Sequence, residues 1–373
     1  MSYIGRCQLL GYKSIKNVSC EFNKGLNIII GNNGSGKTNL LEFIYKVLRR
    51  DYSKLDLFDA RISISSKSGI YHWHFEGIFP VNRVSEPGIQ KIEINEPEKD
   101  IEVYVEFIRF SLPKDIPILS SEFNPKYNLD KRRLLINGAQ EFMPFVFQFW
   151  LPTIFSSFLY GKKTKELKEA DLYQALTNEI LNGFLAELRS QLILYTPIAD
   201  IRFSDTIRIT TIDASTLEFR NIVFEYQINQ QWFSWDALSD GTKRLIYLIF
   251  MMQGVEYDQN DKKEKIESYP VIFIEEPELG IHPHQLHLLM TLVREKAEKQ
   301  QIIITTHSPQ VLDVLAEDEL DRIFITDIDF EKGTTIRKLT EEETAKAKYY
   351  LHDEGMLSDY WRFSDLQNSK ESK

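Results

Sequence analysis

A glycine-rich segment near the N-terminus has the residue types and spacing of a phosphate-binding loop. It matches the pattern GxxxxGK[ST] with Gly31, Asn32, Asn33, Gly34, Ser35, Gly36, Lys37 and Thr38, and Asn39 follows. Glycines let backbone N–H groups converge on a phosphate, and a helix that starts at the loop adds its positive dipole end. We expect Lys37 to reach the β- and γ-phosphates and Thr38 to ligate Mg²⁺, with Asn39 beside them. The alternative is a glycine-rich turn that binds nothing.

Two adjacent carboxylates, Glu275 and Glu276, end the apolar segment that begins at Val271. Neighbouring anions at the end of a buried strand repel each other and lose hydration unless a cation or a water network engages them. In α/β sheets, ligands bind at such strand ends. We therefore predict that Glu275 belongs to the Mg²⁺ shell and that Glu276 is the base for an attacking water. The alternative is a pair of solvated turn residues.

A second apolar segment, from Gln301 to Thr306, ends at His307. A lone histidine is usually structural. Here the two apolar segments are expected to form neighbouring strands, which would place the imidazole near Glu276. We predict that His307 contacts the γ-phosphate or the attacking water and senses whether phosphate is present.

The sequence Leu238-Ser239-Asp240-Gly241-Thr242 precedes an apolar helical stretch from Leu245 to Met252. Taken alone, it predicts a helix N-cap with a turn glycine. Its position relative to the other motifs is also informative. It follows the glycine-rich loop after a long interval and precedes the carboxylates and the histidine.

Hydrophobic periodicity predicts the elements that position these residues. Apolar residues predict strands at Ile4–Leu10, Val18–Phe22 and Leu26–Ile30, and helical spacing predicts a helix over Asn39–Arg50. Between Ala60 and Phe110, alternation predicts antiparallel strands, including one through Ile101, Val103 and Val105. Further elements are a helical segment over Lys162–Leu194, strands from Ile207 to Tyr226, and an α/β region from Leu238 to about Lys338.

Composition limits the class of protein. The 373 residues are 43% hydrophobic, which is ample for a packed core. The start of the chain lacks the pattern of a signal peptide, and no apolar run has the length that a bilayer requires. Cys7 and Cys20 have no metal-ligand spacing and are expected to be reduced thiols. We expect a globular cytoplasmic protein whose net charge of −10 opposes sequence-blind binding to nucleic acid, unless a local basic patch overrides it.

The succession of loop, long insertion, LSxG, carboxylate strand and histidine resembles the RecF-like and OLD-like branch of ABC ATPases. This branch includes SMC heads and stand-alone AAA-family ATPases of bacterial anti-phage defence. The resemblance covers roughly residues 1–50 and 235–330. It implies an α/β P-loop NTPase head of ABC type with an N-terminal antiparallel β subdomain and a mixed central sheet. The expected parts are the first half of the head (1–60), a β-rich and helical insertion before LSxG (61–234) and the second half (235–373).

The resemblance also implies roles for individual residues. In this branch, LSxG of one head caps the γ-phosphate held by another, so Ser239 and Gly241, with Lys243, would act on a partner. ATP and Mg²⁺ would then be sandwiched in a homodimer or higher homo-oligomer. The run from Glu275 to Pro283 resembles the EEPE…HP form of OLD-like proteins, in which Glu replaces the more usual Asp at the magnesium position. His282 and Pro283 would lie in the loop that meets the partner head.

Two features of related ATPases that this sequence lacks restrict the function that we expect. No SMC-type coiled coil and no Toprim carboxylate cluster are recognisable, so we expect an ATP-driven switch that acts with a separate effector, such as a nuclease, in defence or DNA maintenance. The alternative is a direct DNA-binding repair ATPase like RecF. No membrane partner is implied. The basic residues that could serve the alternative are Lys131, Arg132, Arg133, Lys162, Lys163, Lys165 and Lys168, although such runs are more often solvated faces.

The sequence does not decide the roles of three further residues. Gln140 and Gln148 are both candidates for a magnesium-sensing glutamine. Arg202, in the segment that starts at Tyr195, could either face the nucleotide or brace a sheet.

Overall fold

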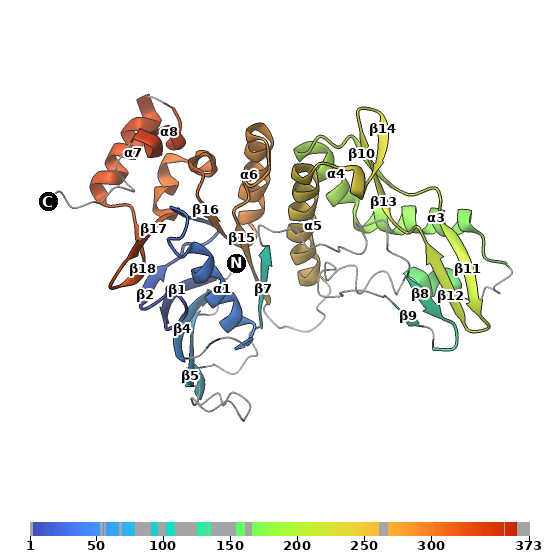
Figure 1. Ribbon diagram of the computed structural model, residues 1–373, viewed down its shortest axis with the longest axis horizontal. Coiled ribbons are helices and arrows are strands. Elements are labelled where there is room, and N and C mark those ends of the chain that lie inside the picture. Colours follow the sequence, from blue (N-terminus) through green and yellow to red (C-terminus); the bar gives the residue numbers. More distant parts are fainter. Residues whose placement is uncertain are drawn as a thin grey trace. The chain divides into compact units, whose positions relative to one another are not determined.

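Two compact units make up the chain in the computed structural model. The first comprises Met1–Phe110 together with Lys262–Lys373, and the second is Ser111–Asp261. The structure describes residues 3–52, 55, 57–66, 69–78, 91–95, 102–108, 125–131, 133–135, 154–160, 166–260, 268–353 and 355–363. Figure 1 follows the chain through the elements of both units.

A five-stranded antiparallel sheet, in the order β2-β1-β4-β5-β6, forms one layer of the first unit. Its strands are β1 (Tyr3–Leu10), β2 (Val18–Glu21), β4 (Leu57–Ser66), β5 (Gly69–Ile78) and β6 (Lys91–Asn95). Side chains alternate between the two faces, so Phe58, Ala60 and Ile62 are buried. Alternation in the sequence predicted β4, β5 and β6 correctly as antiparallel strands.

The second layer is a six-stranded sheet in the order β18-β17-β3-β16-β15-β7. Its strands are β3 (Leu26–Gly31), β7 (Glu102–Ile108), β15 (Ser268–Glu275), β16 (Gln301–Thr306), β17 (Ile323–Asp329) and β18 (Gly333–Lys338). Only β18 runs antiparallel to its neighbour, β17, which confirms the predicted mixed sheet. All residues of β3 and β16 are buried, as expected of parallel strands covered on both faces.

One predicted strand pairs differently from our expectation. We predicted that the segment through Ile101, Val103 and Val105 is antiparallel, but β7 lies parallel to β15 at the edge of the six-stranded sheet. The prediction was wrong because alternation shows which residues share a face and says nothing about the direction of the neighbouring strand.

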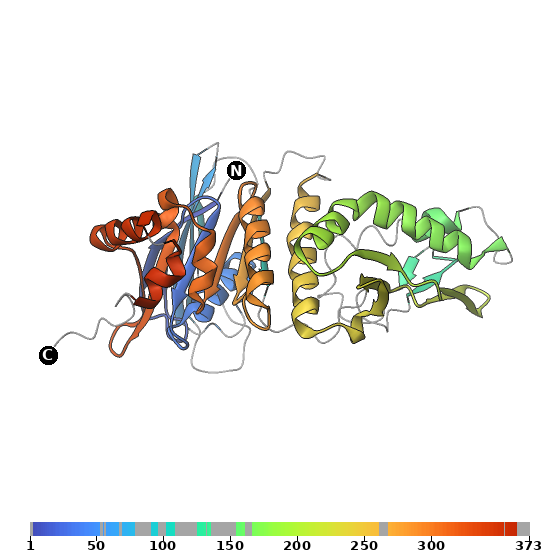
Figure 2. The ribbon, with the colours of Figure 1, turned by 90° about the horizontal axis from the view of Figure 1, so that it is seen from above.

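Helix α1 (Lys37–Leu48) packs between the two sheets of the first unit. Leu40, Leu41, Phe43, Ile44 and Val47 are fully buried in a core with residues of both sheets, which confirms the predicted helix. Helix α6 (Pro283–Ala297) contacts β16 and β3, and Figure 2 shows it outside the sandwich of sheets. The other helices that the structure describes in this unit are the 3₁₀ turns η5 (Pro309–Val314) and η6 (Glu317–Arg322) with α7 (Glu341–Asp353) and α8 (Leu357–Phe363).

The second unit contains two small antiparallel sheets and a set of helices. One sheet has the order β10-β13-β14 and the other β11-β12-β8-β9. The strands are β8 (Lys126–Asn128), β9 (Arg133–Leu135), β10 (Asp200–Phe203), β11 (Arg208–Asp213), β12 (Thr216–Arg220), β13 (Phe224–Ile228) and β14 (Gln231–Ser234). The helices that the structure describes in this unit include α3 (Glu169–Leu176), the π-helical η3 (Thr177–Phe184), α4 (Ala186–Tyr195), the 3₁₀ turn η4 (Trp235–Ala237) and α5 (Asp240–Asn260), and residues 154–159 are also helical.

These elements agree with the predicted helical segment before Leu194 and the predicted strands up to Tyr226. The π-helical stretch was not predicted, because an extra residue per turn leaves only a small change in the spacing of apolar residues. Arg202 braces a sheet: its guanidinium pairs with Glu225 on the neighbouring strand, with an N–O distance of 2.7 Å, and stacks 4.3 Å from the centroid of the Trp232 ring.

Some sequence predictions fall outside the described residues. Gln140 and Gln148 do so, as do the basic residues Arg132, Lys162, Lys163 and Lys165. Among the helices that the structure describes, none combines the length and the apolar content that a membrane span needs.

We predict that Gln301→Leu destabilises the first unit, because this buried side chain joins the two sheets. Gln301 Oε1 accepts from Ile4 N at 2.8 Å, and its Nε2 donates to Ile4 O at 2.9 Å and to Asn23 O at 3.0 Å. Leucine would leave these buried backbone groups unpaired, and the free energy of unfolding should fall by about 3 kcal/mol. Urea denaturation followed by circular dichroism measures the change. Gln285→Leu, at a partly exposed position of α6, is the control, and an equal loss in both variants would contradict the role of Gln301.

Candidate nucleotide-binding site

A pocket of about 520 Å³ in the first unit brings the predicted residues of three segments together. It is lined by Ser14, Asn33, Gly34, Gly36, Lys37, Thr38, Asn39, Glu276, Leu279 and His307. The loop follows β3, Glu276 follows β15 and His307 follows β16, and these strands are parallel. Their carboxyl ends therefore meet at one edge of the sheet, where α/β proteins place ligands.

The loop has the backbone conformation of a phosphate cradle. Gly34 and Gly36 have φ angles of 83° and 94°, a region that favours glycine. Ser35 N donates to Asn32 O, which closes the turn, and Leu40 N donates to Gly36 O, which begins α1. The loop thus ends at the N-terminus of α1, where backbone N–H groups and the helix dipole favour an anion.

Lys37 lies at the centre of the cradle and is only 5% exposed. Its Nζ donates to the carbonyls of Gly31 and Asn32, at 2.7 and 2.9 Å, so the ammonium is held along the loop. Burial lowers the pKa of Lys37 below its ordinary value, and the carboxylates of Glu276, Glu278 and Glu275 act in the opposite direction. The side chain is thus a partly desolvated cation beside a group of carboxylates.

The two predicted magnesium ligands contact each other. The Thr38 hydroxyl donates to Glu275 Oε1, and the Glu275 side chain is buried. Hydroxyl and carboxylate oxygens suit Mg²⁺, which usually takes one or two protein ligands and completes its shell with substrate phosphates and water. No cluster of three His, Cys, Asp or Glu with metal-ligand geometry occurs among the residues that the structure describes. The donor set therefore fits an ion that arrives with a polyphosphate.

Glu276 has an unusual backbone conformation directly after the buried strand. Its φ angle is 45°, in the left-handed region, although it is not a glycine. Its N–H donates to Thr305 O at 2.8 Å, so the neighbouring strand fixes this conformation. Such a conformation costs of the order of 1 to 2 kcal/mol and is concentrated at functional sites. The turn directs Glu276 into the pocket wall, whereas Glu275 stays at the buried strand end.

Glu278 is a residue of the site to which the sequence analysis assigned no role. Its Oε1 accepts from Thr306 Oγ1 at 2.6 Å, from His307 N at 3.1 Å and from Ser308 N at 3.2 Å. The same oxygen lies 3.2 Å from His307 Nδ1, whereas Glu276 Oε1 lies 3.7 Å from it. Glu278 therefore fixes the histidine segment beside Glu276. The sequence feature that could have indicated this role is the position of Glu278 as the third glutamate in Glu-Glu-Pro-Glu.

Side chains of the β17–β18 hairpin form hydrogen bonds that support the loop. The sequence did not predict this support. Ser14 Oγ accepts from Asn39 Nδ2 and from Thr334 Oγ1, both at 2.8 Å, and Ser35 Oγ lies 2.9 Å from Thr326 Oγ1. These hydroxyls are separated by some 300 residues in the chain, so only the tertiary fold brings them together. They hold the cradle on the central sheet.

Ser239 and Gly241 belong to the second unit and are absent from the residues that line this pocket. Ser239 Oγ accepts from Thr242 N at 3.2 Å, so Ser239 is the N-cap of α5 as the sequence predicted. His282 caps α6, with its Nδ1 accepting from His284 N, and Pro283 is the first residue of that helix. Their roles toward a partner head stay predictions.

Comparison with known proteins assigns the family. Residues 26–313 match the family model described as "AAA domain, putative AbiEii toxin, Type IV TA system". The chain belongs to this family of AAA-type P-loop ATPases. It is also 24% identical over 333 residues to Septu protein PtuA of Bacillus thuringiensis, covering 86% of this chain and 75% of that protein. A shorter match, 34% identical over 74 residues, joins it to the DNA replication and repair protein RecF of Streptococcus suis, at 19% of this chain and 20% of that one.

A solved structure supports the fold. The chain is similar to an Smc head domain with an extended coiled coil from Pyrococcus furiosus, with a TM-score of 0.52 and 15% identity over 95% of this chain and 100% of that one. The predicted fold class, an ATPase head of the RecF and SMC type with an antiparallel sheet and a mixed central sheet, is therefore confirmed.

We predict that Gly36→Ala disrupts the cradle more than Gly34→Ala does. Both glycines have positive φ, so alanine costs a similar backbone strain at each. A Cβ at Gly36 would lie 1.9 Å from Thr334 Oγ1, whereas nothing lies within 4 Å of a Cβ at Gly34. Chemical denaturation should show a loss in the free energy of unfolding of about 1 kcal/mol for Gly34→Ala and several for Gly36→Ala. Equal losses would contradict the close contact with Thr334.

Proposed function

We propose that this family member binds and hydrolyses ATP and uses the cycle as a switch between separate and paired heads. The observation that carries the proposal is the convergence of the loop, the Thr38–Glu275 contact, Glu276 and His307 on one pocket. These are the kinds of group that phosphoryl transfer to water would use. Catalysis of this reaction consists almost entirely of positioning and of charge stabilisation.

The roles of the residues follow from their chemistry. Loop amides from Gly31 to Asn39 hold the phosphate oxygens, and Lys37 balances charge on the β- and γ-phosphates. Thr38 and Glu275 would hold Mg²⁺, which neutralises phosphate charge when bound.

Glu276 is the base in the proposed reaction. It takes a proton from water as the water oxygen attacks the γ-phosphorus, and the bond from that phosphorus to the β-phosphate oxygen breaks, which yields ADP and phosphate. His307, held by Glu278, lies on the same side of the pocket and orients the γ-phosphate or the attacking water.

The switch requires a second head. We infer that Ser239 and Gly241 of one copy meet the γ-phosphate bound by another, so ATP bridges two copies and hydrolysis separates them. The N-terminal end of α5 suits this task, because its first-turn N–H groups favour an anion. Differential affinity of ATP for the paired state is what shifts the equilibrium.

We propose that the ATP-driven switch controls a separate effector protein, such as a nuclease, in bacterial defence. Support comes from the similarity to Septu protein PtuA and from the family, whose description refers to a toxin–antitoxin system. A search of the neighbouring genes for a nuclease-like chain, followed by co-expression and co-purification of any such chain with and without ATP, tests this part. A partner that binds equally in every nucleotide state would contradict the switch.

We expect Glu276→Gln to lower the rate of ATP hydrolysis by about 10²- to 10⁴-fold while ATP still binds. Glutamine keeps the shape of the side chain and cannot accept the proton. Phosphate release measures hydrolysis, and calorimetry measures binding. Glu298→Gln, at an exposed position after α6, removes the same charge and should leave the rate unchanged. Turnover by Glu276→Gln at the wild-type rate would show that another group is the base.

We expect Ser239→Asp to abolish ATP-dependent pairing without loss of ATP binding to a single head. Aspartate still caps α5, so the helix is preserved, and its charge repels the γ-phosphate of a partner. Light scattering after size-exclusion chromatography, in the Glu276→Gln background with ATP, measures the pairing. Ser234→Asp, which precedes η4, is the control. A paired Ser239→Asp variant would contradict the contact in trans.

A further inference from the structure

The hydrogen bonds of the Glu278 side chain to described residues all go to one short segment, Thr306–Ser308. Its Oε1 accepts from Thr306 Oγ1 at 2.6 Å, from His307 N at 3.1 Å and from Ser308 N at 3.2 Å. Its Oε2 is buried and has no hydrogen-bond partner among the same residues. The side chain is only 8% exposed, so the loss of its hydration must be offset by the contacts with this segment.

The same carboxylate oxygen also faces the imidazole of His307. Glu278 Oε1 lies 3.2 Å from His307 Nδ1, and Glu276 Oε1 lies 3.7 Å from it. An ionised carboxylate can only accept hydrogen bonds, so Nδ1 must carry a proton in order to bond to it. A neutral ring therefore has its single proton on Nδ1, and a charged ring has protons on both nitrogens. In either state the carboxylate engages Nδ1.

Nε2 is the ring nitrogen of His307 that remains for a ligand. Among the residues that the structure describes, no hydrogen bond or ion pair engages this atom. The His307 side chain is 37% exposed and lines the nucleotide pocket, so a bound molecule can reach the ring. Glu278 is not among the residues that line the pocket. It can affect a ligand there only through the groups that it holds.

We propose that Glu278 is a positioning residue for ATP hydrolysis, because it keeps a proton on Nδ1 of His307 and assigns Nε2 to the reacting groups. A neutral ring accepts a hydrogen bond from the attacking water through Nε2, and a charged ring donates one to the γ-phosphate. The opposite tautomer would turn the lone pair of Nδ1 toward the carboxylate, which repels it. This inference rests on the proposed function for its consequence and on the geometry of the pair for the tautomer.

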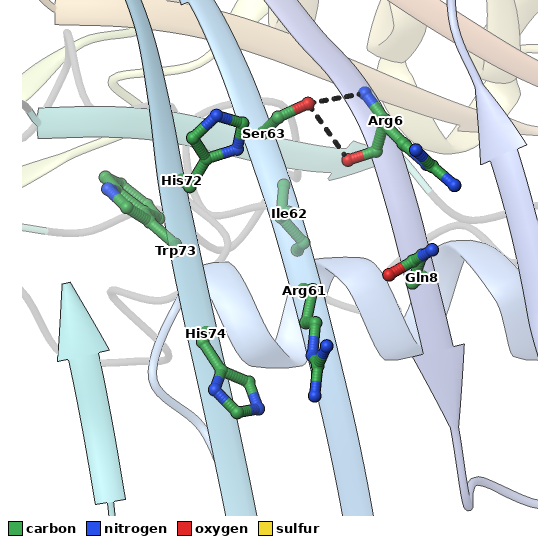
Figure 3. Close-up of a pocket in the computed structure, with 8 residues that line it drawn as sticks. All are labelled: Arg6, Gln8, Arg61, Ile62, Ser63, His72, Trp73 and His74. Carbon is green, nitrogen blue, oxygen red and sulfur yellow. Dashed lines mark hydrogen bonds between the residues drawn. The ribbon is translucent and has the colours of Figure 1, made fainter. Parts of the chain in front are cut away.

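The first unit contains another histidine–carboxylate pair that is connected through the other ring nitrogen. His74 of β5 lines a separate pocket on the antiparallel sheet (Figure 3), and its Nε2 lies 3.2 Å from Asp59 Oδ2. Neither residue lines the nucleotide pocket. By the same argument, a neutral His74 has its proton on Nε2. The two pairs thus predict opposite tautomers, and the pair of His74 and Asp59 is a matched control.

Nitrogen NMR of the full-length protein with isotope-labelled histidine measures which ring nitrogen carries the proton. We expect the neutral ring to be protonated at Nδ1 in His307 and at Nε2 in His74, with the signals assigned from His307→Ala and His74→Ala. Glu278→Leu should remove the preference in His307 only. The measurement requires no hydrolysis, so it is independent of the proposed function. A neutral His307 with its proton on Nε2 would overturn the inference.

The kinetic test is a double-mutant cycle of Glu278 and His307. Glu278→Leu should lower kcat for ATP by about 10- to 100-fold, the usual effect of removing a partner that orients a functional histidine. The affinity for ATP should change little, because Glu278 does not line the pocket. In a His307→Ala background, the same substitution should lower kcat by no more than about twofold, since its effect passes through the imidazole.

Asp59→Leu is the control for the cycle, and it should hydrolyse ATP within about twofold of wild type. A loss of kcat on Glu278→Leu that is equally large with and without the imidazole would show that Glu278 only braces the segment, and would overturn the inference. Wild-type kcat in Glu278→Leu would overturn it too. A wild-type protein that does not hydrolyse ATP would instead contradict the proposed function, and the tautomer of His307 would then decide the inference.

Discussion

The parallel pairing of β3, β16 and β15 is the constraint on which the rest of the structure depends. Their register places Ile30 beside Thr306 and Glu275 beside Thr305, so three segments that are distant in the chain end at one edge of the sheet. All residues of β3 and β16 and residues 271–275 of β15 are buried. A slip of one residue would exchange the two faces of a strand and misplace the residue that follows it. Core packing and the geometry of the site are thus determined by the same register.

Support for the cradle comes from residues around it as much as from the loop itself. Ser14, Thr326 and Thr334 hold the loop, while Glu278 holds the histidine segment. One carboxylate oxygen of Glu278 receives several donors, and its Oε2 is buried without a hydrogen-bond partner among the described residues. Such a group is rare in proteins and is expected where a water or substrate completes the network. Positioning of this kind is the main contribution of a protein to phosphoryl transfer.

A buried contact joins the two sheets of the first unit. The proposed nucleotide site lies at the strand ends of the central sheet. Gln301 joins these sheets through buried hydrogen bonds to Ile4, two residues before Arg6. The sheet that carries the proposed nucleotide site is therefore held to the antiparallel sheet through one packed core.

The sequence by itself determined the local parts of this protein. Lys37 and Thr38 in the glycine-rich loop, the carboxylates after an apolar strand, the helix after the loop and the cap at Ser239 all follow from spacing within a few residues. Residue types restrict the backbone over that range, so such patterns can be read without a structure. The family resemblance then supplied the fold class.

Only the tertiary structure decided the contacts between distant segments. Three of these contacts depend on which strands become neighbours. They are the parallel pairing of β7, the hydrogen bond from Thr334 that braces the loop, and the hydrogen bonds by which Glu278 holds the His307 segment. Alternation of apolar and polar residues determines which side chains share a face of a strand. It does not determine which other strand pairs with that strand. The physical reason is that strand pairing is a property of the whole packed core, which no local spacing records.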